Sequence, residues 1–455
     1  MIKKIIHKYN LKFISNFFYD KEYVRSFPRY KLNNFSKNKN KVLGWVPYIK
    51  NNTEILIFNF FSLNYSIRKK INGVIYLIKN NNIVKQYDFS LAQDELKEIN
   101  CNQIFGDLEG NSIIVELRSS KIRKSHGGHD GHLRFWGKYK NKENYFTSIT
   151  HSMPISYSDL FFEKKINSRN YNLHKNSLKK INFYPGGRIE NNVDVKTHYG
   201  FNVILDKDST PLSCWHLSPK NLSSQPKKKY LQGFYCPDIS QIDPYIIIDN
   251  HETGVNINII ECYLYKNNAV YDNVSIKYEG KFIKKISDIF KKSIDGPYFF
   301  FIKYDSRPVG HSHVHFNINN NLADQVHMHE CRWELKDNKF CPIEVDYKNN
   351  CRKFFFVNNK QDYKNLIILH VDKVSSKSLS NLKIRCLNKE KEVIKNLQIT
   401  NEQPIKIIDL DKINNNQINS NYVVQIESYD YNFSASLMSF NKEKKLLAID
   451  HFTGG

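Results

Sequence analysis

Short apolar runs separated by turn residues cover most of this chain. The runs are rich in β-branched and aromatic side chains, and Asn, Gly or Asp bounds them. Long helical periodicity is almost absent, and only residues 94–99 and 283–292 suggest short helical turns. Regular short strands of this kind predict an all-β protein built from sandwiches or barrels. The expected strands lie at 55–61, 73–78, 83–87, 112–117, 245–248, 255–265, 274–278, 298–302, 366–369, 382–387, 405–410 and 422–427.

The same pattern of strands occurs three times along the chain. Each round opens with an aromatic residue shortly before a proline, at Trp45, Phe234 and Phe340, and closes with a strand that leads into a histidine segment. Repetition on this scale is typical of tandem domains, because solenoid repeats are shorter. We therefore predict two or three tandem β-sandwich-like domains from an internal repeat, with a long insert after the first. The expected boundaries are 1–42 for an N-terminal extension, 43–152 for repeat 1, 153–230 for the insert or linker, 231–335 for repeat 2 and 336–455 for repeat 3.

Histidine is concentrated in two places, in the same order each time. A tight cluster is followed by an aromatic-rich strand and then by one or two further histidines. Imidazole is the commonest metal ligand, so a repeated histidine cluster points to a divalent metal, Zn or Fe. The candidate ligands are His126, His129, His132 and His151 in the first place, and His311, His313, His315, His327 and His329 in the second.

Strand geometry predicts how the second cluster converges. Residues two apart on a strand share a face, so His311, His313 and His315 would line one side of a strand, and His327 and His329 one side of another. If residues 317–325 form the loop of a hairpin, the imidazoles of both strands face a common pocket. In the first cluster, glycines at 127, 128 and 131 would let the backbone bend sharply.

Other interpretations of these histidines stay open. A His-x-His pair on an exposed strand is often an ordinary polar face, and metal-free acid–base catalysis is a further alternative. Neither HExxH nor the other standard metal signatures occur in the sequence, and it has no P-loop, GxSxG or GxGxxG in a strand–helix context. We expect a binding or assembly protein with bound metal. The alternatives are a metal-dependent enzyme with a three-histidine site and a purely structural protein without metal.

The charge of the chain is strongly positive but dispersed. Its formal net charge is +23, yet the lysines are scattered along the whole length. A nucleic-acid interface requires a clustered basic patch, so a nucleic-acid partner is not expected, and a glycan or protein partner is favoured instead. Eight cysteines without a CxxC pair argue against a zinc finger and against a dense disulfide scaffold. No apolar stretch is long enough to span a bilayer, and the expected location is cytoplasmic.

Overall fold

The computed structural model of the chain describes a large part of residues 41–454. In some strands, including all of β9 and β10, the description covers the backbone alone. The described residues are 41–59, 61, 70–79, 82–118, 135–153, 168–174, 177–189, 197–205, 211–217, 230–237, 242–249, 259–277, 281–290, 296–304, 313–318, 321–327, 329–331, 333–342, 351–358, 363–372, 380–399, 405–415, 417–428, 432–441, 443, 446–451 and 453–454.

Residues 41–153, which we call unit 1, form a sandwich of two antiparallel four-stranded sheets. The strand orders are β1-β6-β3-β4 in the outer sheet and β5-β2-β7-β8 in the inner sheet. The elements are β1 (Lys41–Pro47), β2 (Thr53–Phe58), β3 (Ile71–Lys79), β4 (Asn82–Leu91), β5 (Leu96–Asn100), α4 (Cys101–Phe105), β6 (Ser112–Arg118), β7 (Trp136–Lys140) and β8 (Phe146–His151).

Two later stretches repeat this strand order. Unit 2 (residues 230–331) has sheets β16-β15-β18-β13-β21 and β17-β14-β19-β20, and unit 3 (residues 351–454) has β27-β26-β29-β24-β32 and β28-β25-β30-β31. The elements of unit 2 are β13 (Tyr230–Cys236), β14 (Ile242–Asp249), β15 (Ile259–Lys266), β16 (Ala269–Lys277), β17 (Lys281–Lys285), α5 (Ile286–Ile289), β18 (Tyr298–Tyr304), β19 (His313–Ile318), β20 (Asn321–His327) and β21 (His329–Cys331). Those of unit 3 are β24 (Cys351–Val357), β25 (Lys364–Asp372), β26 (Ser380–Leu387), β27 (Glu392–Ile399), β28 (Ile405–Asp409), α6 (Leu410–Asn414), β29 (Tyr422–Ser428), β30 (Asn432–Asn441), β31 (Leu446–His451) and β32 (Thr453–Gly454).

Two further groups of strands lie between the units. The insert sheet, in the order β12-β11-β10-β9, lies between units 1 and 2 in the chain. A short hairpin lies between units 2 and 3, and it packs Trp333 and Phe340 against Phe301 on the outer sheet of unit 2. These elements are β9 (Ser168–His174), β10 (Ser177–Ile189), β11 (Thr197–Leu205), β12 (Pro211–Leu217), β22 (Trp333–Lys336) and β23 (Lys339–Pro342).

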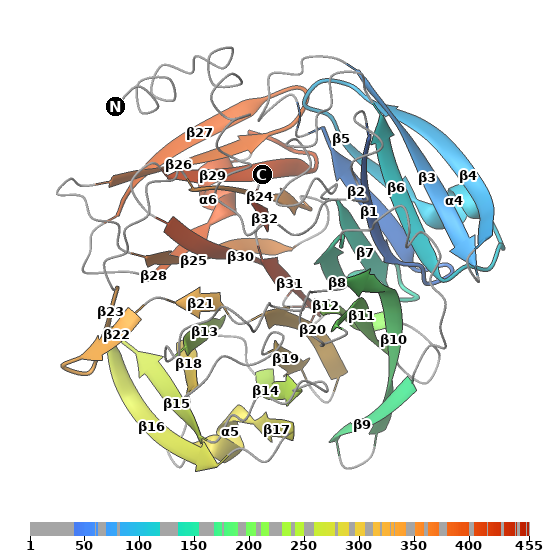
Figure 1. The fold of residues 1–455 in the computed structure, drawn as a ribbon. Coiled ribbons are helices and arrows are strands. Elements are labelled where there is room, and N and C mark those ends of the chain that lie inside the picture. Colours follow the sequence, from blue (N-terminus) through green and yellow to red (C-terminus); the bar gives the residue numbers. More distant parts are fainter. Residues whose placement is uncertain are drawn as a thin grey trace.

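Four edge strands meet in the middle of the molecule, and we call them the axial strands (Figure 1). β8 packs beside β12, β12 beside β20, β20 beside β31, and β31 beside β8, so the ring closes. The inner sheets of the three units and the insert sheet therefore radiate from one axis, in chain order, as blades do in a propeller. In Figure 1 their outermost strands, among them β9, lie toward the rim.

The packing of the blades explains the continuous apolar runs in the sequence. Every residue of β2 is buried, because one face packs in the core of unit 1 and the other faces unit 3. Trp136 of unit 1, for example, contacts Phe354 and Phe355 of unit 3 at ring-centroid distances of 5.6 and 5.4 Å. Strands covered on both faces are apolar throughout rather than alternating. The prediction of an all-β fold of several sandwiches is confirmed, while the domain boundaries drawn from the sequence stay predictions.

One local expectation is wrong. Strand β5 (residues 96–100) takes up most of the expected helical turn at 94–99, and the helix α4 begins only at Cys101. Asn100 ends the strand and caps the helix, because its side chain accepts hydrogen bonds from the backbone N–H groups of Asn102 and Gln103.

Candidate functional site

The structure places the nine candidate histidines unequally. His126, His129, His132 and His311 lie outside the described residues. His313, His315, His327 and His329 are described by their backbone positions, and His151 is described with its side chain.

The second cluster contains the hairpin that the sequence suggested. β19 pairs with β20, and His313 lies directly opposite His327 in the register. Val314 and Phe316 are buried in the core of unit 2, so alternation places positions 313, 315 and 327 on the other face of the sheet. The expected loop at 317–325 is wrong, because β19 runs to Ile318 and β20 already begins at Asn321.

His329 lies on a different sheet from His327. The chain leaves the inner sheet at the end of β20 and enters the outer sheet at β21, where His329 lies opposite Gly233 of β13. The expectation that His327 and His329 line one side of a single strand is therefore wrong. The physical reason is that the chain crosses between the two sheets of the sandwich at this point, which strand alternation alone does not reveal.

His151 forms a buried pair with an aspartate from the opposite end of the chain. Asp450 Oδ2 lies 3.1 Å from His151 Nδ1 and accepts a hydrogen bond of 2.9 Å from the backbone N–H of His151. Both residues are at most 5% exposed. A carboxylate only accepts hydrogen bonds, so the neutral tautomer that fits this contact has its proton on Nδ1, and in that tautomer the lone pair lies on Nε2. The sequence analysis missed Asp450, because 299 positions separate the two residues.

The three units carry a histidine at the same position of their axial strands. The strand that pairs with each axial strand shows this. Trp136 on β7 lies opposite His151, His313 on β19 lies opposite His327, and Ser436 on β30 lies opposite His451. Trp136, His313 and Ser436 are themselves counterparts, since they pair with Leu56, Ile247 and Ile368. Leu56, Ile247 and Ile368 are equivalent because each lies two positions after the residue of its own strand that pairs with a helix N-cap. The three N-caps are Asn100, Lys285 and Asp409.

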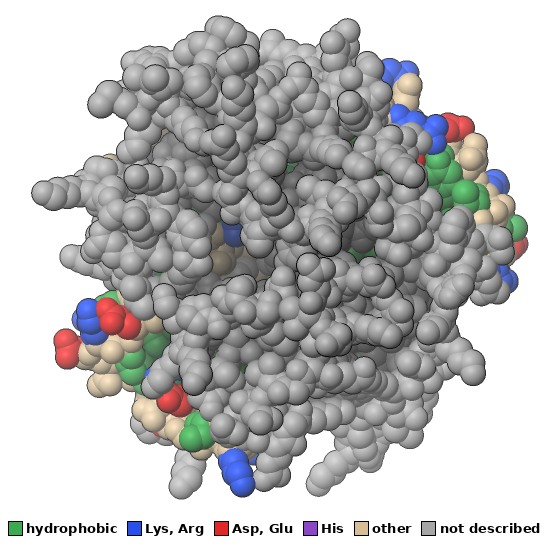
Figure 2. All heavy atoms as spheres, in the orientation of Figure 1, with side chains coloured by type: hydrophobic (Ala, Val, Ile, Leu, Met, Phe, Trp, Pro, Cys, Tyr) green, Lys and Arg blue, Asp and Glu red, His purple; other side chains and the backbone are tan. Residues whose placement is uncertain are grey.

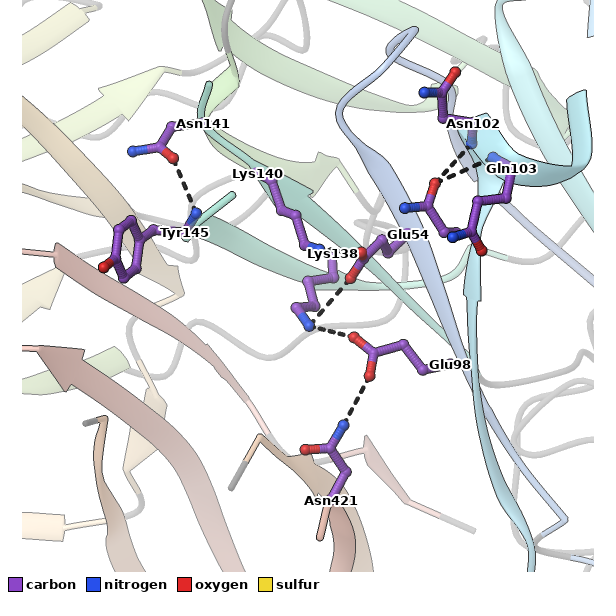
Figure 3. A network of polar contacts seen from close by, with 10 residues as sticks. Glu54, Glu98, Asn102, Gln103, Lys138, Lys140, Asn141, Tyr145 and Asn421 are labelled. Carbon is purple, nitrogen blue, oxygen red and sulfur yellow. Dashed lines mark hydrogen bonds and ion pairs between the residues drawn. The ribbon is translucent and has the colours of Figure 1, made fainter. Parts of the chain in front are cut away.

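A charged network lies beside this region, between units 1 and 3 (Figure 3). Lys138, only 4% exposed, lies 3.2 Å from Glu54 Oε2 and 2.5 Å from Glu98 Oε1. Lys140 forms an ion pair with Glu54, and Asn421 of unit 3 donates a 2.8 Å hydrogen bond to Glu98. The two lysines balance the two glutamates, so the network serves to join the units and has no net charge with which to attract a ligand.

The cavity next to Lys138 is too small for a substrate. It measures about 10 Å³ and lies between Lys138 and Ile149 of unit 1 and residues of unit 3 that include Asn358 and Ser439. A volume of this size holds about one water molecule. Among the side chains that the structure describes, no group of three or more His, Cys, Asp and Glu is arranged to hold a metal ion.

The described surface is of mixed charge. On the face in Figure 2, most of the described side chains in view lie at the rim of the molecule, where Lys and Arg are interspersed with Asp, Glu and apolar groups. Within the described residues, no helix is long and apolar enough to cross a membrane.

Comparisons with known proteins give little further information. No protein-family model matches the chain, and no curated protein matches it. One solved structure, the M60 catalytic domain with the CBM51-1 and CBM51-2 domains of ZmpB from Clostridium perfringens, is 7% identical, with a TM-score of 0.14. The match covers 96% of this chain but only 56% of that one. A TM-score this low carries no argument about fold or function.

Proposed function

We propose that this protein is a binding or assembly protein that holds a divalent metal, Zn or Fe, through its histidines. The observation that carries the proposal is the register of β19 and β20, in which His313 and His327 lie directly opposite each other. Residues in such a pair have Cβ atoms only about 5 Å apart, close enough for both imidazoles to bind one ion. His315 occupies the same face two positions along.

The surroundings of His151 support the same chemistry. Histidines that bind metals commonly donate the other ring N–H to a carboxylate, which fixes the tautomer and makes the ligand nitrogen more basic. The carboxylate of Asp450 lies in the corresponding place, with Oδ2 3.1 Å from His151 Nδ1. A glycan or a protein is the partner class we propose, and its contact surface lies elsewhere than the cavity beside Lys138, which holds about one water molecule.

Metal analysis of the full chain, purified without a histidine tag, tests the proposal. We expect close to one equivalent of a first-row metal or more, and a marked loss in His313→Gln. The matched control is His174→Gln, because His174 ends β9, the outermost strand of the insert sheet. Wild-type protein without stoichiometric metal would contradict the proposal, and so would a His313→Gln variant that keeps its metal. A glycan array probed with and without a chelator then tests the partner class.

A further inference from the structure

The joint between units 1 and 3 differs from the other joints of the ring. Around the axis, β8, β12, β20 and β31 belong to segments that follow one another in the chain. The contact of β31 with β8 instead joins the last unit to the first, and its residues His151 and Asp450 are 299 positions apart. The chain connects these two units only by way of the insert and unit 2. Side-chain contacts must therefore keep this joint closed.

Units 1 and 3 share one apolar core. A single cluster of buried side chains includes Leu117 of the unit 1 sandwich and Val424 of the unit 3 sandwich. Trp136 lies where the two sandwiches meet, fully buried against Phe354 and Phe355 of unit 3. The described buried apolar residues of unit 2 lie in two other clusters, one of which includes the opposite face of the inner sheet of unit 3. Since apolar burial is the main favourable term in folding, separating units 1 and 3 would expose the core of both.

Polar contacts define how the two units meet. Asp450 of unit 3 accepts a hydrogen bond from the backbone N–H of His151, and Asn421 of unit 3 donates one to Glu98 of unit 1. Lys138 lies buried beside the same glutamate, at 2.5 Å from its Oε1. Because hydrogen bonds require a narrow range of distances and angles, these contacts select one alignment of the two units.

We infer that the joint between units 1 and 3 is a clasp, which makes the first and last units of the ring a single cooperative folding unit. Unit 2 has a core of its own and opens without releasing the clasp. The residues of one cooperative unit share one opening free energy, and residues of separate units do not. The inference goes beyond the proposed function and does not depend on a bound metal.

Three buried cysteines report the opening of the three units separately. Cys101 in unit 1 and Cys386 in unit 3 belong to the shared core, and Cys262 in unit 2 belongs to another cluster. All three are free thiols and fully buried, so a thiol reagent reaches each of them only when its unit opens. Labelling of the full chain at increasing urea, followed by mass spectrometry of each peptide, gives the opening free energy at each site.

The clasp predicts equal opening free energies, with equal dependence on urea, at Cys101 and Cys386. The opening free energy at Cys262 should be lower, because unit 2 opens alone. Different values at Cys101 and Cys386 would overturn the inference, and so would one common value at all three cysteines. This measurement uses the unmodified chain, so it decides the question even if a variant does not fold.

A matched pair of core substitutions tests the coupling directly. Phe354→Leu should speed the labelling of both Cys101 and Cys386 by about 5- to 30-fold and leave Cys262 unchanged. The control is Phe300→Leu, because Phe300 is buried among other aromatic rings of unit 2, and it should speed the labelling of Cys262 alone. Faster labelling of Cys386 without Cys101 after Phe354→Leu, or equally faster labelling of all three cysteines, would overturn the clasp.

Discussion

His370 makes the contact between units 2 and 3 sensitive to acid. Its ring lies on β25, fully buried, with Trp333 at 5.6 Å and Phe299 and Phe301 at 6.1 and 6.5 Å between ring centroids. Burial among these aromatic rings disfavours the charged imidazolium and lowers the pKa of His370 from 6.5 to about 3. In the unfolded chain the ring titrates normally, so between pH 6.5 and pH 3 the unfolded state binds up to one proton more than the folded state.

The sign and size of the effect follow from this difference. A depressed pKa for a base means that its contribution to stability is complete above pH 6.5 and is lost as the pH falls toward 3. Each unit of pKa difference corresponds to about 1.4 kcal/mol, so the full loss is about 5 kcal/mol. Between pH 7 and pH 5 the linkage relation gives a loss of about 2 kcal/mol.

Replacing His370 with phenylalanine isolates this contribution. Phe58 occupies the counterpart position in unit 1 and is fully buried, so the blade tolerates that side chain there. We expect wild-type protein to lose about 2 kcal/mol more of its free energy of unfolding than His370→Phe between pH 7 and pH 5. Urea unfolding followed by tryptophan fluorescence measures the difference, and all other titrating groups cancel in it. Phe299→Leu is the control, since it weakens the same contact without removing a titrating group. Equal pH dependence in wild type and His370→Phe would refute the reasoning.

Three further substitutions test other contacts of the fold. Asp450→Ala should lower the free energy of unfolding by about 2–4 kcal/mol, because it removes the carboxylate that lies within hydrogen-bond distance of the backbone N–H and Nδ1 of His151. Denaturant unfolding beside the Ser434→Ala control measures this loss. Lys138→Met should cost about 3–5 kcal/mol, since Glu54 and Glu98 then lose their shared cation, and adding Glu54→Gln should restore part of the loss. Gly233→Ala should cost about 1–3 kcal/mol, because an added Cβ would lie 2.4 Å from Phe301 Cε1; an unchanged melting temperature would contradict this.

The sequence predicts the strands well because local composition decides them. The run at 366–369 lies inside β25 and the run at 422–427 inside β29, and in both cases β-branched and apolar residues fill strands buried on both faces. The hairpin of His313 and His327 was also predictable, since the two segments are close in the chain. Its loop length was not, because the polar sequence at 317–325 gives no sign that the strands continue almost to the turn.

Long-range partners could not be predicted from the sequence. The contact of His151 with Asp450 depends on how units 1 and 3 pack, and that packing is decided by apolar faces such as those of Trp136 and Phe354. The placement of β20 and β21 in different sheets likewise depends on the sandwich as a whole.

The insert sheet packs against unit 1 as well as connecting units 1 and 2 in the chain. Phe201 of the insert sheet meets Trp45 of unit 1 at 4.9 Å between ring centroids, and Val203 and Leu205 join the same core. Thr147 of β8 donates a hydrogen bond to the carbonyl of Pro211 on β12. β12 packs beside both β8 and β20 and so helps to cover their sheet edges, whose exposure folded β-proteins avoid. The insert sheet therefore supplies the fourth blade of the ring, and its strand β12 links β8 of unit 1 with β20 of unit 2 around the axis.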